Sequence, residues 1–235
     1  MLTTRCTLAG ALGTLAVTNV VNHTARPQAA FVVAPVSSAT LVWLAGAAGP
    51  SSSDLGPVVR DSRGARLGAA AAGLVAAAYA VALAVPRTRR AFLDTRYDFG
   101  AGQALLRSLL VVPLGTVVPE ELAFRGVLWE LLPRAHGAAR AAAVSSTVFG
   151  RWHVLPALWQ GHHNETVGHR GGQDPRRLTI TVASVVCFTG VAGVVFCELR
   201  RRSDSLLAPI ALHWATNGLG VLGSTVAWRH IWTGW

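Results

Sequence analysis

The sequence predicts an all-α fold, a polytopic integral membrane helical bundle of about seven transmembrane helices, with six to eight spans as the range. Two observations carry this prediction. Of the 235 residues, 51% are hydrophobic and only 14% are charged, whereas soluble domains carry about 25% charged residues. The apolar residues also gather in long runs, and most runs approach the ~20 residues that a helix needs to cross ~30 Å of hydrocarbon.

Seven apolar runs define the expected helices, with polar connections between them. In chain order they cover residues 7–21, 29–49, 67–86, 101–132, 138–159, 178–199 and 205–228. The first run follows Arg5, as the apolar core of a signal peptide would. No convincing small-residue cleavage site comes after it, so a retained first span is expected. The longest polar connections fall at 50–66 and 160–177.

The fourth run is longer than one span, and Pro113 and Pro119 interrupt it. It is therefore either a kinked helix or an amphipathic segment followed by a half-helix. Small residues are dense at 68–73 and 218–220, where they are expected to let helices approach closely. The chain divides into N-terminal transmembrane spans (1–98) without intramembrane charge and a core (99–235) that holds every polar motif.

Arginine supplies all 21 basic residues, and the formal net charge is +10. A nucleic-acid interface would need these arginines on one face with aromatic stacking partners. Instead they fall mostly between apolar runs, as at Arg87–Arg90, Arg176–Arg177 and Arg200–Arg202. This pattern predicts loop charge that sets topology and contacts anionic lipid headgroups, so the bilayer is an expected partner and nucleic acid is not.

Three polar motifs interrupt the apolar runs of the core, and the first extends from Glu120 to Arg125. An ionisable side chain at membrane depth costs roughly 2.5–3.5 kcal/mol, so such groups mark a functional site. Pro119 suits a first helical turn, where the helix dipole would favour Glu120 and Glu121. Glu121 and Arg125 are four residues apart and are expected to pair. Glu120 is rotated about 100° from Glu121 around the helix, so it is not paired with Arg125 in the same way and could act as a general base for water. The alternative is an ion pair with a structural role alone.

Each of the other two motifs places an imidazole four residues from a partner on the same helix face. Phe149 and His153 form the second motif, with Arg151 between them. A lone histidine in an apolar helix is more often a hydrogen-bonded packing group than a catalyst. His213 and Asn217 form the third motif, in which the carboxamide can fix an imidazole tautomer or donate to an oxyanion. An interhelical hydrogen bond is the alternative.

The three motifs together resemble the CPBP family of intramembrane proteases, which includes CAAX prenyl endopeptidases of the Ras-converting type and bacterial homologues linked to bacteriocin immunity. The family pattern is EExxxR, then FxxxH, then HxxxN. This sequence matches it at Glu120, Glu121, Arg125, Phe149, His153, His213 and Asn217. The resemblance covers roughly residues 101–228. It implies a polar cavity within the bilayer and peptide-bond hydrolysis in which Glu120 activates water.

The predicted function is an intramembrane endopeptidase that acts on membrane-associated peptides or proteins, in the plasma membrane of a bacterial cell. In this prediction Glu121 and Arg125 fix the helix and tune its charge. His153 and His213 position the water, and Asn217 stabilises the oxyanion. The alternative is a non-catalytic scaffold or immunity-type factor that uses the polar cluster as a binding pocket. A third hypothesis, a small transporter, is weaker still, because no inverted repeat is found in the sequence.

Other classes of intramembrane protease lack their motifs in this chain. The HExxH sequence of zinc proteases is absent, as are the GxSG of rhomboid-type and the GxGD of presenilin-type enzymes. The sequence leaves open whether the site binds a metal ion. Glu120, His153 and His213 could form a three-ligand catalytic site for a divalent ion such as zinc, or they could bind water without a metal.

Overall fold

The computed structural model describes residues 3–24, 30–47, 62–132, 137–160 and 175–232, and the regular secondary structure of these residues is helical. The predicted all-α class is therefore confirmed. The long helices are α1 (Thr4–Thr24), α2 (Ala30–Ala47), α3 (Ser62–Ala84), α9 (Ala138–Trp152), α11 (Pro175–Ser203) and α12 (Leu207–Trp232). Shorter elements are α4 (Pro86–Arg89), α10 (Val154–Gln160) and the 3₁₀ turns Arg90–Phe92 and Thr95–Tyr97. The predicted polar connections fall largely outside the described residues.

Within the described residues every predicted apolar run lies mostly on helical backbone, but not every run forms a candidate span. In the described part of the chain, three helices are long and apolar enough to cross a membrane: α3, the segment Ala101–Leu131 and α11. The run at 138–159 is not one helix. It is divided at His153, where α9 ends and α10 begins.

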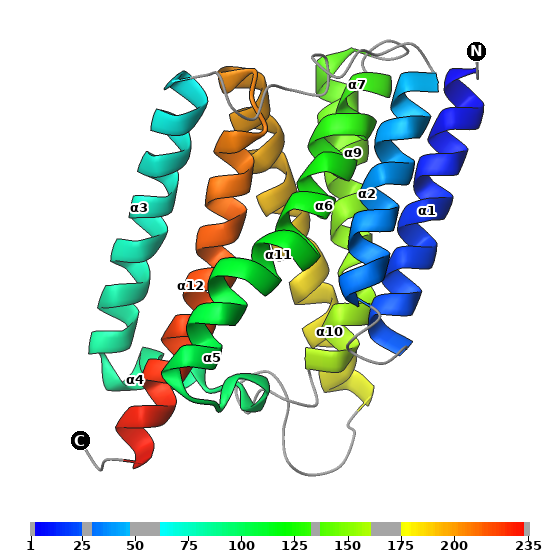
Figure 1. Ribbon diagram of the computed structural model, residues 1–235. Helices are drawn as coiled ribbons and strands as arrows, with labels where there is room; N and C mark the ends of the chain where they lie inside the picture. Colours follow the sequence, from blue (N-terminus) through cyan, green and yellow to red (C-terminus); the bar gives the residue numbers. More distant parts are fainter. Residues whose placement is uncertain (1–2, 25–29, 48–61, 133–136, 161–174, 233–235) are drawn as a thin grey trace.

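The bundle has two helix pairs with the segment Ala101–Leu131 between them (Figure 1). On one side α1 packs along α2, and on the other α3 packs along α12. α9 packs against α11. At Gly68 of α3 a Cβ atom would lie 2.9 Å from the Cβ of Ala211, and at Gly150 of α9 it would lie 2.8 Å from the Val186 carbonyl oxygen. The expected close approach at small residues is thus confirmed for Gly68.

The segment Ala101–Leu131 is one continuous helical path, which supports the kinked-helix alternative over the half-helix. Its elements are α5 (Ala101–Leu106), α6 (Val118–Glu121), α7 (Leu128–Leu131) and π-helical stretches at Arg107–Val111, Pro113–Val117 and Leu122–Val127. The backbone before Pro119 is already helical, with φ −64° and ψ −55° at Val117. The expected helix start at Pro119 is therefore wrong, and Glu120 gains nothing from a dipole end. Proline inside a helix and π turns both disturb the regular hydrogen-bond ladder, and here the two occur together.

One hydrophobic cluster joins the N-terminal helices to the core. It contains Ala11, Leu15, Leu41, Ala45, Ala123, Phe124, Val127, Leu128, Leu131, Leu132, Ala141, Phe149, Trp152 and Phe196. Four of these residues come from α1 and α2, and the rest come from the core. The division at residue 98 stays a prediction, and within the described residues the two parts share their packing.

The expectation of loop charge is wrong for Arg200. This residue lies in the last turn of α11 and is 2% exposed. Its guanidinium donates to Asp204 (2.7 Å), to Glu130 (3.3 Å) and to the backbone carbonyl of Arg125 (3.3 Å). A buried arginine needs such partners because its charge is costly away from water. Arg200 therefore ties the end of α11 to the helix that carries the first motif.

Candidate active site

Glu121 and Arg125 form the buried ion pair that their spacing predicts. Nη1 of Arg125 lies 3.2 Å from Oε1 of Glu121, and both side chains are 0% exposed. Nη2 of Arg125 donates to the carbonyl of Gly193 in α11 (3.3 Å). The guanidinium also lies over the ring of Phe149, 4.2 Å from its centroid. The carboxylate, the carbonyl and the aromatic face compensate the buried charge, although Nε of Arg125 and Oε2 of Glu121 have no hydrogen-bond partner among the described residues. The pair thus links the helical segments that carry Glu121, Phe149 and Gly193.

His213 of α12 lies between the two carboxylates. Its Nδ1 is 2.7 Å from Oε1 of Glu121, and its Nε2 is 3.9 Å from Oε2 of Glu120. Because an ionised carboxylate only accepts, Nδ1 carries the proton in this contact, and in a neutral ring Nε2 is then the unprotonated nitrogen. The ring stacks on Phe196, with centroids 5.1 Å apart and planes 22° from parallel. Glu121 therefore orients the imidazole, and the opposite nitrogen faces Glu120.

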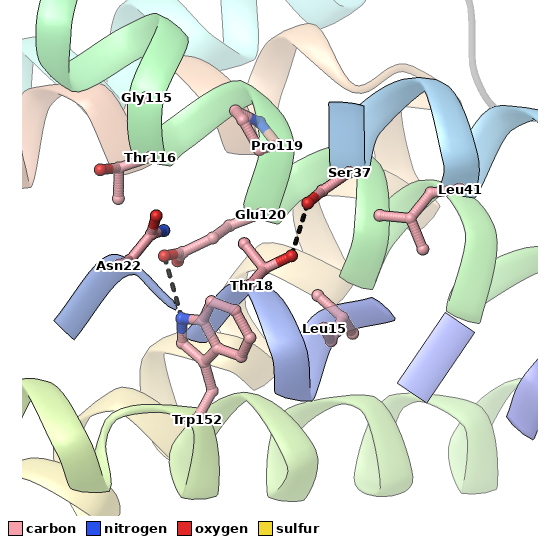
Figure 2. A pocket seen from close by; sticks show the side chains of 10 residues that line it. All are labelled: Leu15, Thr18, Asn22, Ser37, Leu41, Gly115, Thr116, Pro119, Glu120 and Trp152. Carbon is pink, nitrogen blue, oxygen red and sulfur yellow. Dashed lines mark hydrogen bonds between the residues drawn. The ribbon is translucent and has the colours of Figure 1, made fainter. Parts of the chain in front are cut away.

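Glu120 has a different environment from its neighbour. Its Oε1 accepts a hydrogen bond from Nε1 of Trp152 (3.0 Å), while its buried Oε2 has no hydrogen-bond partner among the described residues. The residue is 8% exposed and lines a cavity between α1, α2, α9 and the segment Ala101–Leu131, the central segment (Figure 2). A buried acceptor without a partner costs about 1–3 kcal/mol, so this oxygen is suited to bind a small donor such as water.

Trp152 is a site residue that the sequence reasoning missed. Its backbone carbonyl accepts a hydrogen bond from Nδ2 of Asn19 in α1 (2.9 Å), and its ring packs edge-on against Phe124. A signal was present, because Trp152 follows Phe149 by three residues and shares its helix face. A buried indole N–H needs an acceptor, and a carboxylate is available across the cavity.

Phe149 brings the second and third motifs together. Its ring contacts His153 at a centroid distance of 4.7 Å and His213 at 5.9 Å, so the two imidazoles lie against one aromatic side chain. Nδ1 of His153 is 2.8 Å from the carbonyl of Phe149, and the residue is half-buried. If Nδ1 donates in this contact, Nε2 remains an acceptor. Phe149 thus forms an apolar wall beside both imidazoles.

Asn217 does not join this cluster through any contact of the described residues. Its side chain is exposed, and its Oδ1 lies 3.5 Å from the hydroxyl of Thr216. The predicted role of this carboxamide beside Glu120, His153 and His213 therefore stays a prediction. The helical spacing is as expected, since Asn217 lies one turn after His213 on α12. Arg151 is exposed as well.

The donor set does not have the arrangement of a metal site. Within the described ranges, no group of three or more His, Cys, Asp or Glu side chains could hold a metal ion. Nδ1 of His213 is taken by Glu121, and Nδ1 of His153 lies against a carbonyl oxygen. These contacts leave the Nε2 atom of each histidine available as a ligand, but as they are placed Glu120, His153 and His213 do not form a three-ligand group and so do not fit a zinc site.

Comparison with known proteins agrees with the motifs. Residues 102–219, half of the chain, match the family model of the type II CAAX prenyl endopeptidase Rce1-like proteins. The matched range contains His153, His213 and Asn217 and all but the first residue of the central segment. Helices α1, α2 and α3 lie outside it. No curated protein and no solved structure matches the chain significantly.

Proposed function

Because this chain belongs to the Rce1-like CAAX prenyl endopeptidase (CPBP) family, we propose that it is an intramembrane endopeptidase that hydrolyses peptide bonds of membrane-associated substrates. One observation supports this most strongly. A single imidazole lies between two adjacent buried carboxylates, each of which has an Oε2 atom without a hydrogen-bond partner among the described residues, and Glu120 also lines a cavity. A purely structural polar cluster would be expected to satisfy both carboxylates.

The membrane placement is part of the proposal. Three helices have the length and hydropathy of spans, and the remaining predicted runs lie on helices that pack beside them. Large apolar side chains such as Leu74, Phe188 and Val191 are exposed on α3 and α11. An apolar exterior around a polar centre is the arrangement expected of a bundle that lies in lipid. We propose that all seven predicted runs cross the bilayer.

The proposed reaction is attack of a water molecule on the substrate carbonyl carbon. Oε2 of Glu120 takes one water proton as the carbon–oxygen bond forms, and the carbonyl electron pair moves to oxygen to give a tetrahedral oxyanion. The oxyanion then collapses and the carbon–nitrogen bond breaks. The proton held by Glu120 passes to the leaving amine nitrogen. The products are an amine and a carboxylic acid, and the carboxylate of Glu120 is regenerated.

The neighbouring side chains have distinct proposed roles. Trp152 holds Oε1 of Glu120 and so directs Oε2 to the cavity. His213, oriented by Glu121, presents Nε2 to the reacting carboxylate. His153 helps to position the water through its ring, which packs against Phe149. Asn217 is the proposed oxyanion donor: its Oδ1 lies against Thr216, and its exposed amide can donate to a substrate carbonyl oxygen.

The test compares wild type with Glu120→Gln, reconstituted in liposomes with membrane-anchored peptides, one of them a prenylated CAAX peptide. Wild type is expected to release fragments that mass spectrometry identifies, and Glu120→Gln to release at least 10²-fold less, the usual worth of a general base. Equal cleavage by both proteins would exclude the mechanism. Tight binding without cleavage by both would favour the scaffold alternative.

A further inference from the structure

The cavity at Glu120 draws much of its wall from helices outside the family-matched range. Five of its ten lining residues belong to α1 and α2: Leu15, Thr18, Asn22, Ser37 and Leu41. The others are Gly115, Thr116, Pro119 and Glu120 of the central segment, and Trp152 of α9. Figure 2 shows the carboxamide of Asn22 and the carboxylate of Glu120 at the same end of this cavity. The N-terminal helices are thus part of the site as well as a packing layer.

Two buried acceptors line this cavity without partners. Oε2 of Glu120 and Oδ1 of Asn22 have no hydrogen-bond partner within the described part of the chain. Neither oxygen can donate to the other, so direct contact does not satisfy them. A water molecule has two O–H donors and can serve both. The cavity has a volume of about 20 Å³, which is more than the ~10–15 Å³ that one water molecule needs.

Asn22 is also held in place by its own helix. Asn19, one turn earlier on α1, donates to the Trp152 carbonyl (2.9 Å) and so ties α1 to α9. The hydroxyls of Thr18 and Ser37 hydrogen-bond across α1 and α2. Both contacts lie about one turn before Asn22 on α1. A polar group carried on a fixed helix orients a ligand better than one on a mobile loop.

We propose that the attacking water is bound between Oε2 of Glu120 and Oδ1 of Asn22, so that α1 supplies a catalytic residue from outside the family-matched segment. Glu120 takes one proton of this water and Asn22 holds the other, which aims the oxygen lone pair at the substrate carbonyl. The role rests on the proposed endopeptidase activity.

A kinetic test compares Asn22→Leu, which removes the acceptor, with Asn22→Asp, which keeps one. Asn22→Leu is expected to lower kcat by about 10–10²-fold with little change in KM. Asn22→Asp should recover part of kcat. Thr24→Val, two residues along the same helix and exposed, is the matched control and should retain wild-type kinetics. All three should melt in detergent within about 3 °C of wild type.

A structural readout keeps this inference separate from the proposed activity. An experimental structure at a resolution that shows waters should reveal one water within hydrogen-bond distance of both Glu120 and Asn22, and Asn22→Leu should lose it. If Glu120→Gln cleaves like wild type, the proposed function fails, whatever the water position. If Glu120 is essential but Asn22→Leu keeps the wild-type kcat, or if no water bridges the two residues, the Asn22 inference is overturned.

Discussion

The two sides of the His213 imidazole differ in the partners of their carboxylates and in access to a cavity. On the Nδ1 side, Glu121 is 0% exposed and binds both Arg125 and the imidazole through Oε1, while its buried Oε2 has no hydrogen-bond partner among the described residues. On the Nε2 side, Glu120 has one hydrogen bond from Trp152 and an unpartnered oxygen at a cavity. Adjacent residues of the same chemical type thus have different environments. We propose from this comparison that Glu121 stabilises the fold and orients the ring, while Glu120 takes part in the reaction.

The largest expected effect separates the two carboxylates by activity. Glu120→Gln should reduce cleavage by on the order of 10²–10⁴-fold, because it removes the general base and keeps the shape. Membrane insertion and melting temperature should stay near those of wild type. Glu121→Gln, the matched control, should lower the melting temperature because it removes the charge that compensates Arg125. If Glu120→Gln is inactive only because it fails to fold, the comparison breaks down.

The next effect concerns stability on the Glu121 side. Arg125→Ala should cost roughly 3–5 kcal/mol of unfolding free energy, since it strands a buried carboxylate. Arg201→Ala is the control, because Arg201 pairs with Glu198 at an exposed site and such pairs are worth about 0–1 kcal/mol. Thermal unfolding in detergent measures both. The double variant Glu121→Ala with Arg125→Ala should be more stable than the worse single variant, and a double variant no better than that would contradict the pairing.

On the Glu120 side, Asn217→Ala tests whether the exposed carboxamide serves the reaction. As an oxyanion donor it should contribute on the order of 10²-fold to kcat. The melting temperature should not change, because the side chain is exposed and its described contact is with the neighbouring Thr216. Steady-state kinetics beside a melting curve checks both statements. Wild-type kcat in Asn217→Ala would remove this residue from the site.

A smaller effect is expected from the indole that holds Glu120. Trp152→Phe removes one hydrogen bond to a charged group, worth about 1.5–3 kcal/mol, and should lower kcat about tenfold by freeing the carboxylate to rotate. Trp228→Phe removes a similar bond, from its Nε1 to the Asp94 carbonyl (3.0 Å), at a distance from the cavity. It should lose stability and keep kcat. Equal activity losses in the two variants would show that Trp152 acts through folding alone.

The smallest expected effect is that of a metal chelator. Excess EDTA should leave the cleavage rate within about twofold of its starting value, because the protein ligands do not converge on one point. Activity that is lost with EDTA and restored by zinc would mean that Glu120, His153 and His213 rearrange into a metal site. Glu120 would then be a metal ligand, and its proposed role as a free general base opposite Glu121 would be wrong.

The sequence alone determined the features that depend on local spacing. Long apolar runs predicted the helices, and the four-residue spacing predicted the pair of Glu121 with Arg125 and the shared helix face of Phe149 and His153, whose rings meet edge-on. These succeed because residues four apart share a helix face whatever the rest of the fold does. The family motifs were identified in the same way, as short patterns in fixed order along the chain.

Only the tertiary structure decided which groups meet across helices. His213 contacts Glu121 from 92 positions away, Trp152 reaches Glu120 from 32, and Arg200 pairs with Glu130 from 70. Asn22 enters the cavity from a helix that no motif marks, while Asn217, which a motif does mark, is exposed. Periodicity fixes a face of a helix but not its rotation, depth or neighbour. Those follow from how whole helices pack, through contacts such as the close approach at Gly68 and the buried ion pairs.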